Sequence, residues 1–195
     1  MAVLQVVLVS TRPGRAGQPI ARWVLDRALA DGRFEVELVD LADPVLPLMD
    51  EPNHPRLRRY VHQHTRDWSA RVDRADAFAF VMPEYNYGLT APLKNAIDYL
   101  HDEWKYKPAG LVSYGGVSGG TRAAQMAKQV MTTLSMMPLS EAVPIPFFSQ
   151  FMEDGALRPN QIMEDALSAM LDGLVRWEEA LRPMREGLRE GRAAG

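Results

Sequence analysis

The chain has 195 residues, 47% of them hydrophobic, and a formal net charge of −3 at pH 7. This length suits one domain that can bury a full core, and the near balance of charge argues against nucleic acid as a partner. Because the sequence contains no cysteine, it excludes a disulfide framework, a thiolate metal site and a cysteine nucleophile.

The first predicted element is a strand at residues 3–9. This run is almost continuously apolar and rich in valine, which is typical of a strand buried on both faces of a parallel sheet. No basic region precedes it, no small-residue cleavage site follows it, and it is too short to span a bilayer. We therefore expect a soluble cytoplasmic protein without a membrane partner.

Strands and helices then alternate along the chain. After a polar loop, a helix is predicted from Pro19 to residue 30, because proline is well tolerated in the first turn. The other predicted strands are 34–39, 77–82, 109–113 and 139–143. The other predicted helices are 58–73, 90–100 with Thr90 as its cap, 121–136 and 159–181. Residues 183–195 lose the helical period, so we predict a folded domain at 1–182 and a disordered tail.

This alternation predicts right-handed crossovers and an α/β fold with helices on both faces of a parallel sheet. Five such units in this length suit a flavodoxin-like doubly wound five-stranded parallel sheet with strand order 2-1-3-4-5. Ligands of such sheets bind outside the carboxyl ends of the strands. We therefore expect function in the loops that follow the first, third and fourth strands.

The first of these loops, STRPGRAG, has the residues of a phosphate site. It places Ser10, Thr11, Arg12 and Arg15 just before a helix, and hydroxyl, guanidinium and helix-terminal N–H groups bind phosphate together. The dinucleotide fingerprint GxGxxG and the Walker A lysine are both missing, which favours a mononucleotide. The alternative is a solvated loop with two exposed arginines.

The other two loops offer surfaces for a flat ligand. In MPEYNYGL, Pro83 stiffens the exit from the strand, Asn86 can donate and accept hydrogen bonds, and Tyr85 and Tyr87 supply aromatic surface. In YGGVSGG, residues 114–120, the glycines let the backbone approach a ligand closely. Each loop alone could be a turn or an interface, but three unusual loops at one sheet edge favour a ligand site.

The segment PEYNYGLTAPLKNAIDYL closely resembles the signature of the NADPH-dependent FMN reductase family, flavodoxin-like flavoproteins that include flavin, quinone, azo-dye and chromate reductases. The segments STRPGR and EWKYKPAGLVSYGGVSGGTRA are similar to that family as well, and the likeness covers about residues 3–180. The resemblance implies FMN as the bound cofactor and NADPH or NADH as the hydride donor.

The resemblance also implies which residues contact FMN, and it implies no catalytic or metal-binding residue. Its phosphate and ribityl chain would be held by Ser10, Arg12, Arg15, Gln18, Pro19 and Ile20. One side of its isoalloxazine ring would contact Pro83, Glu84, Tyr85 and Asn86, and the other side Gly115, Gly116 and Ser118. The sequence departs from the family pattern at Gly17 or Gln18 and at Gly88, where many relatives carry serine. The lost hydroxyl weakens phosphate binding unless the amide of Gln18 replaces it.

By the same resemblance, hydride would pass from the nicotinamide through flavin N5 to a small acceptor in a ping-pong reaction. Flavin, quinone, azo compounds and metal oxyanions all remain open as acceptors. The alternatives are a non-catalytic flavin-binding electron carrier or redox sensor, and a nucleotide-binding regulator without flavin.

The family also implies a homodimer or homotetramer in which the partner closes over the flavin. We expect Trp104 and residues 147–151 near that contact, because aromatic residues are enriched at subunit interfaces, although ordinary core filling is the alternative. No metal site is expected: His62 and His64 lie two apart in a predicted helix, which directs them to different faces.

Overall fold

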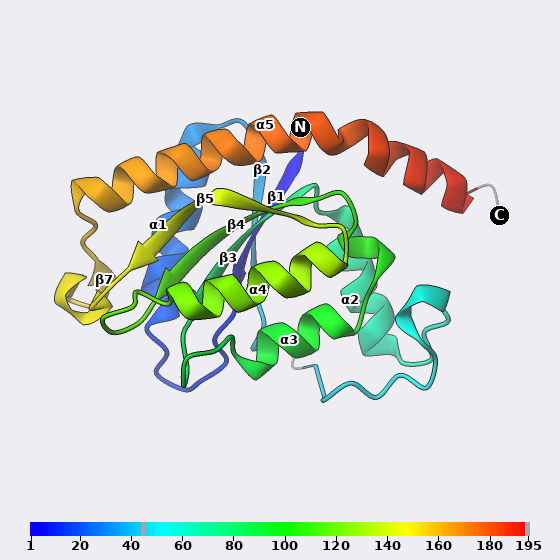
Figure 1. Ribbon diagram of the computed structural model, residues 1–195, viewed down its shortest axis with the longest axis horizontal. Helices are drawn as coiled ribbons and strands as arrows, with labels where there is room; N and C mark the ends of the chain where they lie inside the picture. Colours follow the sequence, from blue (N-terminus) through cyan, green and yellow to red (C-terminus); the bar gives the residue numbers. More distant parts are fainter. Residues whose placement is uncertain (44–45, 194–195) are drawn as a thin grey trace.

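Five strands form one parallel sheet in the order β2-β1-β3-β4-β5 (Figure 1). The computed structural model describes residues 1–43 and 46–193, with no side-chain description for 192–193. The strands are β1 (Val3–Leu8), β2 (Glu35–Asp40), β3 (Ala77–Pro83), β4 (Pro108–Tyr114) and β5 (Met137–Ile145). The predicted doubly wound α/β fold and its strand order are confirmed.

Helices cover both faces of this sheet. One face is covered by α1 (Gly17–Asp31) and α5 (Gln161–Ala193). The other is covered by α2 (Gln63–Arg74), α3 (Ala91–Asp98) and α4 (Thr121–Thr133). Short 3-10 helices and one small hairpin complete the described structure: η1 (Pro55–Leu57), η2 (Asp102–Trp104), η3 (Phe148–Phe151), β6 (Met152–Glu153) and β7 (Ala156–Leu157).

The core consists of two apolar layers, one on each face of the sheet. Every residue of β3 and β4 is buried, as expected for central strands covered on both faces. Burial of a side chain such as Phe78 or Phe80 contributes roughly 1.5–3 kcal/mol to folding. At Gly110 a Cβ would lie 2.6 Å from the Met170 sulfur, so the glycine lets α5 approach β4 closely.

The carboxyl-terminal segment differs from the prediction. The helix was expected to end near residue 181, but α5 continues to Ala193 with Pro183 inside it. The extension is held by charge: Arg185 pairs with Glu178 and with Asp76, and Arg189 lies 3.3 Å from the Asp76 carboxylate. Because these are ion pairs, an apolar period could not reveal them. Residues 194–195 of the predicted tail lie outside the described part of the chain.

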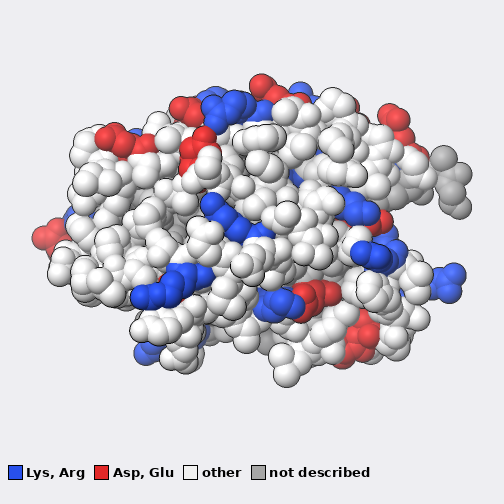
Figure 2. All heavy atoms as spheres, in the orientation of Figure 1, with Lys and Arg blue, Asp and Glu red and all other residues white. Residues whose placement is uncertain are grey.

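Other element boundaries moved by a few residues. The helix predicted at 58–73 begins only at Gln63, because its N-cap His62 has an extended backbone; Glu51 accepts the backbone N–H groups of Val61 and His62 just before the helix. Thr90 is the N-cap of α3 as predicted, but its hydroxyl makes no capping hydrogen bond. No helix in the described ranges has the length and apolarity needed to cross a bilayer. On the face shown in Figure 2, side chains of both charges are interspersed over a largely uncharged surface.

Candidate functional site

The loops that follow β1, β3 and β4 come together at the carboxyl edge of the sheet. The Glu84 N–H donates to the Tyr114 carbonyl oxygen over 3.1 Å, which joins the second loop to the end of β4. The hydroxyl groups of Ser10 and Tyr85 lie 3.2 Å apart, which joins the first loop to the second. Three segments distant in sequence therefore form one surface.

A third hydroxyl, from Tyr114, lies beside this pair and was missed by sequence analysis. Burial raises the pKa of Tyr114, and the neighbouring Tyr85 raises it further, while a hydrogen bond with Ser10 acts in the opposite direction. A Cβ on Gly17 would lie only 2.5 Å from the Tyr114 hydroxyl oxygen. This close approach requires glycine at position 17, so serine could be accommodated at position 18 but not at 17 unless Tyr114 moves.

The amino-terminus of α1 offers donors to an anion. Its N-cap residue, Ala16, supplies no side-chain hydrogen bond to the first-turn N–H groups, which carry the positive end of the helix dipole. Arg12 in the preceding loop and Gln18 in the first turn are exposed, and Pro19 is partly exposed. Ile20 is fully buried in the core, so it can offer only its backbone to a ligand. The arrangement is suited to a phosphate group.

Arg15, predicted in the same phosphate site, is engaged elsewhere. Its guanidinium donates to the Ser10 carbonyl oxygen at 2.7 Å and forms a bidentate ion pair with Asp40 at the end of β2. Its side chain is only 14% exposed. The structure therefore gives Arg15 a role in tying the first loop to β2, and its phosphate contact stays a prediction.

The second loop is a tight two-residue hairpin. Tyr85 and Gly88 exchange backbone hydrogen bonds of 3.2 and 3.0 Å. The two central residues, Asn86 and Tyr87, have φ angles of +50° and +66°. Asparagine tolerates this left-handed region, but a bulky tyrosine adopts it at a cost of about 1–3 kcal/mol. The turn is thus strained at the point where the sequence predicts ligand contact.

Glu84 directs its carboxylate away from open solvent and onto the start of α4. The side chain is 7% exposed, accepts the Arg122 backbone N–H at 3.1 Å, and forms an ion pair with the Arg122 guanidinium. Burial alone would raise the pKa of Glu84, but hydrogen bonds from Ser118 and Arg122 and the charge of Arg122 together lower it below its ordinary value. Glu84 therefore connects the second loop to the third.

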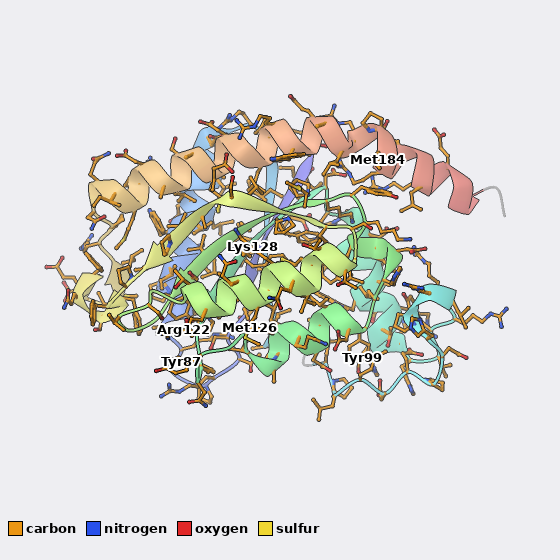
Figure 3. The ribbon with its side chains drawn as sticks, in the orientation of Figure 1. Tyr87, Tyr99, Arg122, Met126, Lys128 and Met184 are labelled. Atoms are coloured by element: carbon orange, nitrogen blue, oxygen red, sulfur yellow. The ribbon has the colours of Figure 1, made fainter. Side chains whose placement is uncertain are left out.

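A hollow of about 540 Å³ lies between the second and third loops. Its wall on the third loop includes Gly116, where a Cβ would meet nothing within 4 Å, and Ser118. Gly115 is more confined, since a Cβ there would lie 3.2 Å from the Gly120 nitrogen. Arg122, at the start of α4, completes the wall, and its guanidinium lies 4.0 Å from the centre of the exposed Tyr87 ring (Figure 3).

A second hollow, of about 420 Å³, lies between Thr11, the segment after β2 and the first turns of α3. Its lining is mainly apolar, with Leu41, Leu46 and Pro92 among its residues. It lacks the glycine-rich backbone and the charged groups of the first hollow, so it does not suit a phosphorylated polar cofactor. The hollow between the second and third loops is the candidate site.

The structure bears on two expectations about aromatic residues. Trp104 is 1% exposed within the core beside α2 and α3, which favours the alternative of core filling, and its place near a subunit contact stays a prediction. His62 and His64 do not point to different faces: their rings stack 5.2 Å apart, because His62 is the extended N-cap of α2 and not a helical residue. The aromatic Phe147, by contrast, is 48% exposed.

Known proteins are similar to this chain in sequence. The NADPH-dependent FMN reductase family matches residues 3–150. The NAD(P)H-dependent FMN reductase of Schizosaccharomyces pombe is 41% identical over 145 residues, 72% of either chain. The quinone reductase of Pseudomonas putida is 31% identical over 180 residues, 88% of this chain and 92% of that protein.

Among solved structures, the flavoenzyme NAD(P)H:(acceptor) oxidoreductase FerB of Paracoccus denitrificans has the same fold. It superposes with a TM-score of 0.72 at 24% identity, covering 92% of this chain and 98% of that one. The family match extends over most of the chain and includes all three loops of the candidate site. This chain therefore belongs to the NADPH-dependent FMN reductase family.

Proposed function

We propose that this protein is an FMN-dependent NAD(P)H oxidoreductase that reduces a small acceptor. The observation that carries the proposal is the hollow of about 540 Å³ between a strained aromatic turn and a glycine-rich loop, at the same sheet edge as the uncapped amino-terminus of α1. A flat ring with a phosphate at one end matches that combination of a hollow and an anion site.

The residues present fit the phosphate end of FMN. The first-turn N–H groups of α1 have no side-chain cap, and the exposed Arg12 supplies a positive charge beside them. Gln18, exposed in the first turn of α1, supplies an amide donor beside them. We propose that these groups hold the phosphate, while Ser10 and Arg15 shape the loop around it.

The residues present also fit the ring end. Gly116 leaves open space where any side chain would intrude, so backbone from residues 115 to 118 can lie close to a ring edge. Pro83 ends β3, and Glu84 and Asn86 after it line the hollow between the loops. We propose that backbone N–H groups of the third loop stabilise negative charge that develops at that edge.

Bound FMN would supply the hydride chemistry, accepting hydride from NAD(P)H and passing it to an acceptor in alternating half-reactions. The chain's own residues bind, orient and shield, and we assign none of them as nucleophile or obligatory base. Flavin, quinone, azo compounds and metal oxyanions are the proposed acceptor classes, and the names of the relatives support the first two.

The experiment that tests this function is an absorbance titration. Apoprotein mixed with FMN should retain the flavin through gel filtration, and anaerobic NADPH or NADH should then bleach the flavin band within seconds. Failure to retain FMN would refute the cofactor assignment. Retention without bleaching would instead support an electron carrier, although the interspersed charges on the face in Figure 2 do not resemble an acidic docking surface.

We also propose that the protein is a cytoplasmic homodimer or homotetramer. Exposed apolar side chains gather on the loops and helix around the candidate site, as expected of a contact surface. They are Tyr85, Tyr87, Val117, Met126 and Phe147. Light scattering at micromolar concentration checks this proposal, and a monomeric mass would contradict it.

A further inference from the structure

We propose that Arg122 is a positioning residue that holds the 84–88 turn in its ligand-binding conformation. The inference deepens the proposed function, because it concerns the loop expected to contact the flavin ring. It rests on three contacts of one residue, two of them from its guanidinium, on the strain of the turn that it touches, and on the position of this arginine in its helix.

Arg122 contacts the residue before the turn, Glu84, and a central residue of the turn, Tyr87. Its backbone N–H and its guanidinium both bind the Glu84 carboxylate, which precedes the turn. The same guanidinium lies over the ring of Tyr87, 4.0 Å from the ring centre, at the second central position of the turn (Figure 3). The planar guanidinium can bind a carboxylate and stack on an aromatic face at once, which a lysine cannot do equally well.

The turn requires such support. Asn86 and Tyr87 both have left-handed φ angles, and the tyrosine is 71% exposed, so little besides Arg122 holds its side chain. A strained conformation persists only where its surroundings determine it. Without the guanidinium, the competent turn would become a minor population, and the apparent affinity for its ligand would fall by that fraction.

The position of Arg122 supports the same conclusion. It lies in the first turn of α4, where the helix dipole disfavours a cation. Glu84 offsets this cost, since its carboxylate is both the counter-ion of the guanidinium and an acceptor for the first-turn backbone. Glu84 already neutralises the charge of Arg122. Support of the turn therefore explains an arginine at this position better than recognition of an anionic substrate does.

The test compares Arg122→Gln with Lys128→Gln, which removes an equal charge from the same helix away from the turn. In the apoprotein, we measure hydrogen exchange of the Tyr85 and Gly88 amides, which close the turn. We expect about tenfold faster exchange at both amides in R122Q and wild-type rates in K128Q. This readout needs no cofactor.

With FMN added, R122Q should bind about tenfold more weakly, equivalent to about 1.4 kcal/mol. The midpoint potential of the retained FMN should shift, which a general loss of stability would not produce. Arg122→Lys restores the charge opposite Glu84 without the planar face. It should therefore recover only part of the amide protection and part of the FMN affinity that R122Q loses. Tyr87→Ser removes only the stacking contact, so it should reproduce part of the R122Q effect, and the double variant should be no worse than R122Q alone.

Equal exchange at Tyr85 and Gly88 in R122Q and K128Q would overturn the proposal, as would faster exchange with unchanged FMN affinity and potential. If the effects of R122Q and Tyr87→Ser on exchange and FMN affinity were additive, the stacking of the two side chains would not be what supports the turn. If wild-type protein binds no FMN while R122Q still accelerates exchange, the support of the turn stands and the proposed function fails.

Discussion

Both edges of the sheet hold ion pairs, but the two edges differ in how much of their polar surface is satisfied within the chain. At the amino edge, charges are buried and paired: Arg185 is 2% exposed and contacts Glu178 and Asp76. At the carboxyl edge, α1 has no side-chain cap and the turn at Asn86 and Tyr87 is left-handed. The contrast indicates that the amino edge stabilises the fold, whereas the carboxyl edge retains free donors and strain for a ligand.

The largest effect on stability is expected from a substitution that removes an ion pair at the amino edge. Glu178→Ala leaves the buried guanidinium of Arg185 without its main partner, so we expect a loss of about 3–5 kcal/mol in the free energy of unfolding. Urea denaturation of the apoprotein measures this loss. Glu179→Ala removes an exposed carboxylate from the next position and should change stability by less than about 0.5 kcal/mol. FMN affinity of the folded fraction should be unchanged in both variants. A loss of FMN affinity in E178A alone would show that the two edges are coupled.

The second prediction uses pH to probe the same edge. Lys107 is 2% exposed, and burial lowers its pKa to about 7. Between pH about 7 and the ordinary pKa of 10.5, Lys107 is protonated in the unfolded chain and neutral in the folded protein. The free energy of unfolding should therefore rise with pH in this range. Relative to Lys107→Met, the wild type should gain up to about 1.4 kcal/mol per pH unit above pH ~7. Lys128→Met controls for loss of an exposed lysine, and a difference that stays flat up to pH ~9 would contradict the assignment.

The contrast between the edges also explains what the sequence could predict. The apolar run at β3 and the glycines after β4 act through local pattern, so the strand order and the three loops could be predicted. The contacts of Arg122 could not be predicted, because its partner Glu84 is 38 residues away and no local pattern in either segment indicates the pairing. The only local signal was a cation in the first turn of a helix, where cations are disfavoured.

The extension of α5 escaped prediction for a related reason. Its contacts from Arg185 and Arg189 go to Asp76, which precedes β3, and such pairing leaves no period in the sequence. Arg15 shows the same limit, because a guanidinium beside a helix start predicts a phosphate contact, and nothing in that segment indicates its ion pair with Asp40 at the end of β2. Residue type and local spacing therefore do not predict which ion pairs the charges of the candidate site form.

A third prediction concerns the packing beneath the carboxyl edge. Gly17→Ser places a Cβ 2.5 Å from the Tyr114 hydroxyl and 2.9 Å from a Leu8 methyl group, so it should cost about 1–3 kcal/mol of stability. Gln18→Ser, one residue on, is exposed and should be neutral for stability. Thermal unfolding of both apoproteins checks the pair. Equal stability would show that Tyr114 can move, and that position 17 is less constrained than its distances indicate.

The smallest effect on stability should accompany a clear effect on binding. At Gly116, a Cβ meets nothing within 4 Å, so Gly116→Val should change apoprotein stability by less than about 0.5 kcal/mol. The valine would nevertheless occupy space that a flavin ring needs, and FMN should bind at least tenfold more weakly, about 1.4 kcal/mol. Gly187, equally open but on α5, provides the control variant Gly187→Val. Full FMN affinity in G116V would place the ring elsewhere and remove the third loop from the site.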